Sequence, residues 1–431
     1  MANPVVYTIS EGVVTKIFSG AMNKSLHNIT RDVKFLSTYR DAGETALSIS
    51  EISSEGSLLF SEDGVNEVIN LDEKADFYVF CPSGTGQIKV SEAPRRSSMP
   101  YAYDIAEGNI EGHAAFTKIG FAPSLTANAN TDIWSYAGTQ AVYLFPTAEM
   151  GMEVVGSNNT DDIGTSIKSG TSTGGSLTTL IDSVVDFTTA TAVAVGDAVI
   201  LDKSGASPEF GWVTAVAAHQ LTIAGGFSRG GSGSGRAYVV LDKSATAGAH
   251  AVEINYLDGD YAEYREIVIM NGTTVVPTVK LDLFRINSFR VVAGGANGIP
   301  TGNLILRHID NTPVYSFITA GFNRARNAMY TVPAGKVLYV TDIAAGYATS
   351  GSPNKEYARV TTRANIDPTS KFKTDGLFYP FTDVLVQNVT VPISLAMPTK
   401  LPEKTDIKLS VIGSANGVVI SALRGWLEDE S

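Results

Sequence analysis

Four carboxylates lie around a glycine-containing turn and are the residues best placed in the sequence to do chemistry. Asp258, Asp260, Glu263 and Glu266 occur within LDGDYAEYRE. Paired Asp and Glu side chains can hydrolyse a glycosidic bond, one as general acid and one as nucleophile or base. Alternating Asp residues with a glycine and a distal Glu can bind Ca²⁺, a pattern that this segment matches only in part. A solvated hairpin turn is the third alternative, and the sequence favours it over calcium binding and catalysis.

The remaining acidic and histidine residues show no ligand spacing. Asp161 and Asp162 lie in SNNTDDIGTSIKSGTSTGGS, a polar, Gly-rich segment that predicts an exposed loop. No two histidines are spaced as metal ligands, and no HExxH motif occurs. The five histidines are His27, His113, His219, His250 and His308. We therefore expect no catalytic, cofactor-binding or metal site, and a protein that is not an enzyme.

Other motifs that could support chemistry also have simpler structural interpretations. The single cysteine, Cys81, follows the apolar run FYVF, which predicts a buried thiol rather than a nucleophile. The GGSGSG run at Gly230–Gly235 does not match GxGxxG and precedes no helix, so we expect a flexible loop. Trp134, Trp212 and Trp426 could form a platform for sugars, but their spread through strand-like segments favours core positions.

Charge argues against a nucleic-acid partner. The net charge is −12, whereas binding to phosphates without sequence preference requires clustered cations. The basic pairs Arg95–Arg96 and Arg324/Arg326 are the best candidates for a local patch, and a solvated or salt-bridged surface is the favoured interpretation. No stretch approaches the roughly 18 apolar residues of a spanning helix, and the first residues lack the features of a signal peptide. We therefore expect no membrane partner.

The elements that must position these residues are strands. Short runs rich in Val, Ile, Phe and Tyr alternate with turns rich in Gly, Asp and Asn, and no amphipathic helix of three turns is found. A helix over 22–39 is the weaker alternative to strands there. Asp258-Gly259-Asp260 predicts one hairpin, and the alternation at Ile407–Val411 followed by Asn416-Gly417 predicts a closing hairpin.

The pattern predicts an all-β protein with several small antiparallel sandwich or barrel domains in series, one inserted in another. Pro and Ser residues mark a linker, and Gly-rich loops flank the inserted module. The expected parts are an N-terminal β domain at 1–92, a linker at 93–100, a sandwich at 101–171 and 245–290, a small barrel at 172–244, and a C-terminal sandwich at 291–431.

Several segments resemble a pattern in virion structural proteins of tailed phages. TVPAGKVLYVTDI, at Thr331–Ile343, followed by YARVTTR, is similar to their "IPAGK"-like turn, which leads into a strand and then an arginine-bearing strand. Val332 stands where the pattern has Ile. AVEINYLDGDYAEYREIVIMNGTTVV and SNNTDDIGT also resemble segments of these proteins, so that the likeness covers roughly 102–156 and 245–364. The barrel segment is an insertion that departs from the pattern, although it is similar to β-modules of phage structural proteins.

The resemblance implies a non-enzymatic capsid decoration, head-fibre or collar protein, because the first 90 residues also resemble short decoration and head-fibre proteins. Its expected partners are further copies of itself, as a trimer, and other virion proteins such as the major capsid protein. The N-terminal domain would be the anchor, and the protein would assemble in the host cytoplasm. The alternatives are a fibre tip that binds a receptor or host surface glycan, and a spike that degrades polysaccharide.

Overall fold

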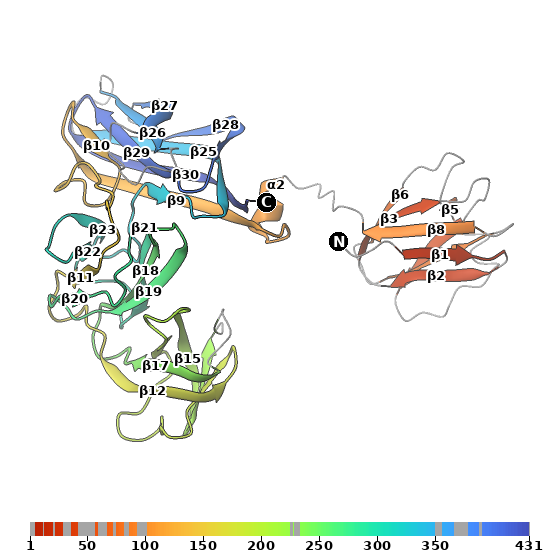
Figure 1. The fold of residues 1–431 in the computed structure, drawn as a ribbon, viewed down its shortest axis with the longest axis horizontal. Helices are drawn as coiled ribbons and strands as arrows, with labels where there is room; N and C mark the ends of the chain where they lie inside the picture. Colours follow the sequence, from red (N-terminus) through yellow and green to blue (C-terminus); the bar gives the residue numbers. More distant parts are fainter. Residues whose placement is uncertain are drawn as a thin grey trace. The chain divides into compact units, whose positions relative to one another are not determined.

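The computed structural model is all-β, as predicted, and divides into two compact units, Met1–Tyr101 and Ala102–Ser431 (Figure 1). It describes residues 5–11, 13–19, 22–28, 36–41, 57–58, 67–71, 75–81, 86–92, 101–224, 227, 233–349, 356–365, 378–387 and 390–430. The only helix in these ranges is the short α2 (Tyr101–Ala106), and none is long and apolar enough to cross a membrane.

The Met1–Tyr101 unit contains two four-stranded antiparallel sheets. The first has the order β1 (Val5–Ile9), β8 (Gly86–Glu92), β3 (Met22–Asn28), β6 (Glu67–Leu71). The second has the order β2 (Val14–Ser19), β7 (Ala75–Phe80), β4 (Leu36–Asp41), β5 (Ser57–Leu58). The weaker alternative of a helix over 22–39 is wrong, because β3 and β4 begin in that segment. The predicted linker at 93–100 lies outside the described residues.

Two facing sheets form the C-terminal sandwich of the second unit. One has the order β28 (Thr390–Leu401), β25 (Lys336–Thr349), β30 (Gly417–Asp429), β9 (His113–Leu125). The other has the order β10 (Asn130–Asp132), β29 (Asp406–Gly413), β26 (Ala358–Asn365), β27 (Tyr379–Val386), with β24 (Met329–Thr331) also on β29. Apolar residues of both sheets, among them Leu338 and Leu409, share one core with Trp134.

The predicted closing hairpin is wrong. β29 pairs with β26, whereas β30 pairs with β25 and β9, so the SANG segment crosses from one sheet to the other. The alternation along β29 misleads because Lys408 and Ser410 are buried too, and both bond to Asp132 on the neighbouring β10. Gly417 has no positive φ; a Cβ there would lie 2.5 Å from the Ala348 carbonyl oxygen, so close packing requires the glycine.

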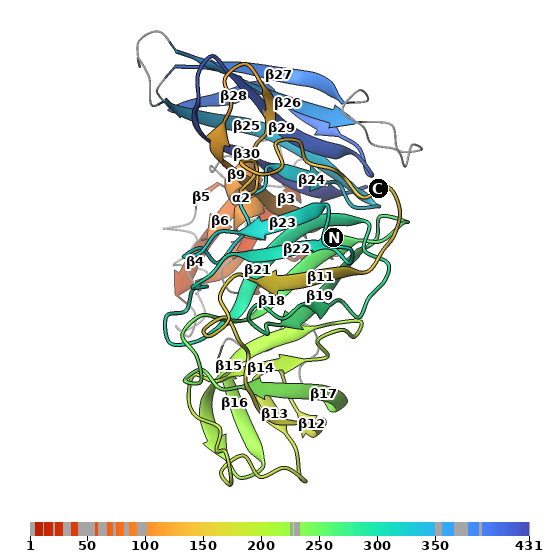
Figure 2. The ribbon, with the colours of Figure 1, turned by 90° about the vertical axis from the view of Figure 1, so that its left-hand side faces the viewer.

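A middle body of two small sheets lies next to the sandwich (Figure 2). One sheet has the order β20 (Val276–Pro277), β11 (Met152–Gly156), β22 (Leu304–His308), β23 (Val314–Ile318). The other has the order β19 (Glu263–Ile269), β18 (Ala249–Leu257), β21 (Arg285–Gly294). The hairpin predicted at Asp258-Gly259-Asp260 is confirmed, because β18 and β19 pair antiparallel from Leu257↔Glu263 onward.

Six strands close into a small barrel beyond the middle body. Their order is β12 (Ser166–Gly175), β13 (Thr179–Ile181), β16 (Gln220–Ala224), β15 (Glu209–Ala217), β14 (Ala198–Leu201), β17 (Ser234–Leu241). β12 corrects the prediction that residues 157–176 form one exposed loop. Its Gly, Ser and Thr side chains show no apolar alternation, since the barrel buries only Ser172 from this strand.

The expected boundaries inside the second unit need correction. Residues 113–132, expected in the middle domain, supply β9 and β10 of the C-terminal sandwich. Residues 291–318, expected in the C-terminal domain, supply the end of β21 and all of β22 and β23 in the middle body. The barrel runs from 166 to 241 rather than from 172 to 244. Pairing between β9 and β30 joins residues some 300 positions apart, which no local pattern can show.

Candidate functional site

The carboxylates of LDGDYAEYRE are not brought together into a catalytic pair. Asp258 accepts backbone bonds from Asp260 and Ala262 at 3.0 and 2.9 Å, which shapes the hairpin turn. Glu263 accepts from the Asn255 amide at 2.7 Å. Glu266 is buried and accepts from the backbone N–H groups of Val279 and Lys280 at 2.7 and 3.1 Å. Burial raises the pKa of Glu266, and the two backbone bonds oppose this shift.

The structure gives no direct support to the calcium alternative. Among the described residues, no group of three His, Cys, Asp or Glu side chains could hold a metal ion. The Asp258 side chain is instead a turn-forming acceptor at the tip of the hairpin. Such use of an Asp side chain by its own backbone is common where the chain reverses direction.

Asp162 is a structural residue rather than part of an exposed loop. Its side chain is fully buried, and its two oxygens accept from the backbone N–H groups of Ala249, Thr301 and Gly302 at 2.7 to 3.0 Å. One carboxylate therefore holds the ends of three segments of the middle body together. A buried charge is tolerated when it is hydrogen-bonded in this way.

The isolated residues mostly have local structural roles. Cys81 is buried, as expected. His219 bonds the Val185 carbonyl, and His250 bonds the Thr246 hydroxyl. The side chain of His27, the pair Arg95–Arg96 and residues 230–232 of the GGSGSG run lie outside the described residues.

The tryptophans lie in different surroundings. Trp134 is fully buried in the sandwich core and Trp426 stacks on Tyr339 with 5.4 Å between ring centroids. Trp212, on the barrel, is 45% exposed and lies edge-on to Phe210. The sugar platform suggested by sequence is therefore not formed by the three together, since Trp134 is inaccessible.

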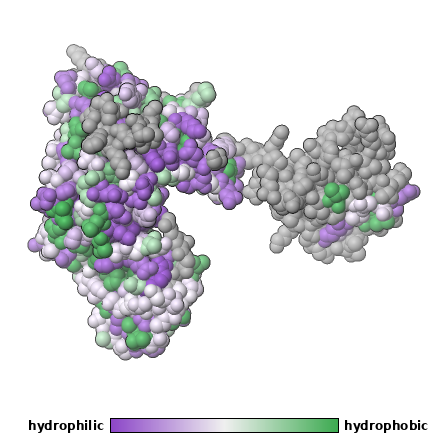
Figure 3. Space-filling model, viewed as in Figure 1, coloured by the Kyte–Doolittle hydropathy of each residue, from purple (hydrophilic) through white to green (hydrophobic). Residues whose placement is uncertain are grey.

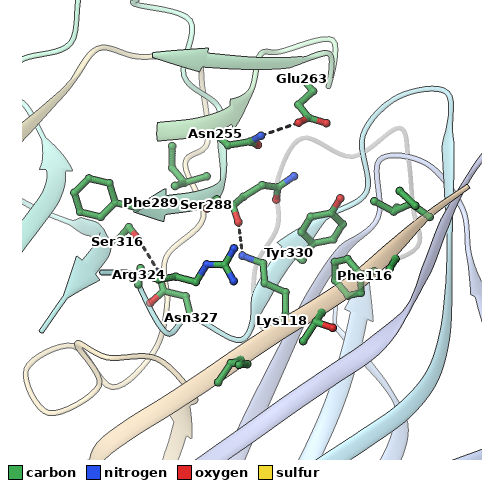
Figure 4. A pocket seen from close by; sticks show the side chains of 18 residues that line it. Phe116, Lys118, Asn255, Glu263, Ser288, Phe289, Ser316, Arg324, Asn327 and Tyr330 are labelled. Carbon is green, nitrogen blue, oxygen red and sulfur yellow. Dashed lines mark hydrogen bonds between the residues drawn. The ribbon is translucent and has the colours of Figure 1, made fainter. Parts of the chain in front are cut away.

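A cleft of about 400 Å³ lies between β9 of the sandwich and β21 of the middle body, and it is the best candidate for a functional site (Figure 4). β9 contributes Phe116 and Lys118, and β21 contributes Ser288. The segment that joins β23 to β24 contributes Arg324 and Asn327. Three elements that are distant in sequence therefore supply its polar groups.

Two cations lie at one end of this cleft. The Lys118 amine and the Arg324 guanidinium point toward each other in Figure 4. Lys118 donates to the Asn287 carbonyl oxygen and lies 5.8 Å from the centre of the Tyr330 ring. Burial, with a smaller effect from the charge of Arg324, lowers the pKa of Lys118 to about 7. Within the described part of the chain, no carboxylate lies at ion-pair distance from either cation.

Amide and carboxylate groups supply the other polar features of the cleft. Asn327 is buried and donates from Nδ2 to the Ser316 hydroxyl at 2.9 Å, while its Oδ1 has no hydrogen-bond partner among the described residues. A buried acceptor without a hydrogen bond is energetically unfavourable unless a bound molecule or a water donates to it. At the far wall, Glu263 and Asn255 form a hydrogen-bonded pair. The cleft thus has two cations with the Asn327 amide beside them, and further acceptors at the far wall.

One signal in the sequence points to this site. In AAFTKIGFA, residues 116, 118 and 120 share one face of the strand, and Phe116 and Gly120 are buried. A lysine in that register must be turned toward the interior. Arg324, by contrast, stands out in the sequence only as one of a basic pair, and its companion Arg326 lies over the Phe322 ring at 3.8 Å instead.

No protein-family model matches the sequence, and no curated protein matches it.

Proposed function

We propose that the chain is a non-enzymatic structural component of a tailed-phage virion, assembled as a homo-oligomer in a capsid decoration, head-fibre or collar. The observation that carries this proposal is a pair of edge strands in the C-terminal sandwich, β27 and β28, which bear large exposed apolar side chains. Tyr379 and Leu385 on β27 are 64% and 65% exposed, and Met397 on β28 is 81% exposed.

Edge strands have unpaired backbone groups along one side and can add a strand of another chain. Exposed apolar side chains on the same strands favour contact with a protein surface rather than with water. On the face drawn in Figure 3, the described surface of the second unit mixes hydrophilic residues with hydrophobic patches. Repeated copies of one chain in a particle would cover the edges of both sheets at this end of the sandwich.

The phage-like motif contributes to the same sandwich. In TVPAGK, Gly335 has a φ of +71° and turns the chain into β25, a 14-residue strand that pairs along its length with β30. YARVTTR forms most of β26 in the facing sheet. The resemblance therefore rests on residues that build the framework of the sandwich, and this supports a structural role.

The virion assignment is tested on purified particles. We expect the chain to be present in a fixed ratio to the major capsid protein by quantitative mass spectrometry, and label attached to its N-terminal unit to appear at one location by electron microscopy. Particles from a mutant that lacks the gene should lose this protein and the label. An unchanged protein inventory in the mutant particles would refute the proposal.

The assembly surface is tested on the purified chain by sedimentation. We expect Leu385→Lys together with Met397→Lys to shift the oligomer toward monomer. Ile420→Lys is the matched control, because Ile420 is 44% exposed on β30, which has neighbours on both sides. If the control dissociates the oligomer equally, the edge strands are not the contact.

Binding to a receptor or host glycan is a second candidate, favoured by the half-exposed Trp212 beside Phe210 on the barrel. Aromatic faces of this kind can contact the carbon face of a sugar. We expect host-cell adsorption by the purified protein, and protection of Trp212 fluorescence from acrylamide, if this candidate is correct. A Trp212→Ala chain that adsorbs as well as the unmodified protein would exclude this surface.

A further inference from the structure

We infer that the cleft between β9 and β21 binds a small molecule that carries one carboxylate and several hydroxyl groups, as a uronic acid does. The inference depends on the groups that line the cleft and not on the place of the protein in a particle. It assigns a ligand-binding site to a part of the molecule that the proposed structural function does not use.

The cationic end of the cleft fits a carboxylate. The guanidinium of Arg324 presents a planar set of donors, and such a fork pairs well with the two oxygens of a carboxylate. Lys118 uses one donor on the Asn287 carbonyl, which leaves others for a ligand. Two neighbouring cations without an acidic partner repel each other, and a bound anion would remove that repulsion.

The opposite wall fits hydroxyl groups. Glu263 and Asn255 offer oxygen atoms there that can accept from a ligand. A further acceptor, Asn327 Oδ1, lies beside Arg324 in Figure 4 and has no partner within the described chain. The charges also select among anions. With two cations and the single carboxylate of Glu263 lining the cleft, a monoanion balances the site better than a dianion such as sulfate.

The size and walls of the cleft agree with this ligand class. A volume of about 400 Å³ lies in the range typical of sites for small molecules. Phe116 and Tyr330 form part of the wall, and Tyr330 is only 9% exposed. Their ring atoms provide an apolar surface against the carbon skeleton of a sugar while the polar groups contact its substituents.

The test is a calorimetric titration of the full chain at pH 6 with D-glucuronate, D-glucose, acetate and inorganic sulfate. We expect glucuronate to bind at least about tenfold more tightly than each of the others. Glucose lacks the carboxylate, acetate lacks the hydroxyl groups, and sulfate carries a second negative charge. Glucose binding as tightly as glucuronate would overturn the role of the cations. Acetate or sulfate binding as tightly would overturn the inferred ligand class.

Variants locate the binding in the cleft. Arg324→Gln should weaken glucuronate binding by at least about tenfold, the loss expected for one charge-assisted hydrogen bond. Arg359→Gln is the matched control, because Arg359 is an exposed arginine on β26 that does not line the cleft, and it should bind as the unmodified chain does. Circular dichroism melting establishes that both variants fold. A folded Arg324→Gln chain with unchanged affinity would overturn the inference.

Discussion

Arg285 and Asp406 form an ion pair that is completely buried where the middle body meets the C-terminal sandwich. Arg285 Nε and Nη2 donate to the two carboxylate oxygens at 3.0 and 3.1 Å. Its Nη1 donates to the Pro146 carbonyl at 2.6 Å, and the Thr331 hydroxyl donates to Asp406 at 2.6 Å. Because β21 carries the arginine and β29 the aspartate, the pair fastens two bodies of the second unit to each other.

Asp406→Asn should therefore be strongly destabilising. Removing one charge leaves the other buried without a counterion, which typically costs about 3–5 kcal/mol. The measurement is the free energy of unfolding from urea titration. Asp429→Asn is the control, because Asp429 pairs with Lys336 at the exposed end of β30 and such surface pairs contribute about 0–1 kcal/mol. Equal losses in the two variants would contradict the assigned role of Arg285 and Asp406.

In a second buried ion pair, a double substitution should recover part of the stability that a single substitution removes. Lys408 and Asp132 are both fully buried 3.1 Å apart, and Asp132 also accepts from Ser410 and from the Tyr143 backbone. Lys408→Met should cost about 3–5 kcal/mol of unfolding free energy, because it removes the lysine charge that faces the buried carboxylate. Adding Asp132→Asn should recover part of the loss, since the amide oxygen can still accept hydrogen bonds. A double variant less stable than the single one would contradict this prediction.

The burial of His250 should make the folded chain less stable in mild acid. Its ring is 1% exposed and Nε2 lies 2.8 Å from the Thr246 hydroxyl. Burial lowers the pKa of His250. A hydrogen bond with the Thr246 backbone and the charges of Asp242, Asp162 and Asp197 only partly oppose this shift. The unfolded chain therefore takes up a proton more readily, so stability falls as the pH drops below about 6.5.

Melting temperatures measured between pH 7.5 and 5.5 test this dependence. His250→Gln should show a shallower decline than the unmodified chain over that window. His219→Gln is the control, because His219 is exposed on the barrel. A decline that is unchanged in His250→Gln and lost in the control would show that another group is responsible.

Lys118 should lower the stability of the folded chain at pH 7 while it contributes to the affinity for glucuronate. Since its pKa in the folded chain is about 7, against 10.5 for an ordinary lysine, the unfolded chain holds more protons between these values. Stability should therefore rise with pH from about 7 to 10.5 through this group. Lys118→Met should flatten that rise and be the more stable chain at pH 7, while its affinity for glucuronate falls.

Paired urea titrations at pH 7 and pH 9.5 measure the effect of Lys118. The other titratable groups that face the cleft are Arg324, Glu263 and Tyr330, and the Met variant retains all three. A stability difference between the two chains that is the same at both pH values would contradict the lowered pKa of Lys118.

Local pattern was enough to predict strands and some turns. The apolar runs, the glycine turns and Asp258-Gly259-Asp260 are properties of short segments, and the observed β18–β19 hairpin follows from them. Where a strand was covered on both faces, the same reasoning failed. Lys408 and Ser410 resemble solvent-facing residues of a hairpin strand, but they are buried against Asp132.

The sequence by itself determined that this chain is all-β, because the residue period of a strand and the chemistry of its turns are local. Only the tertiary structure decided which strands share a sheet, since pairing such as that of β9 with β30 depends on contacts between distant segments. It also decided the buried pair of Arg285 with Asp406 and the cleft of Lys118 and Arg324, whose members are distant in sequence. The physical reason is that burial and charge balance are properties of the packed chain and not of any segment.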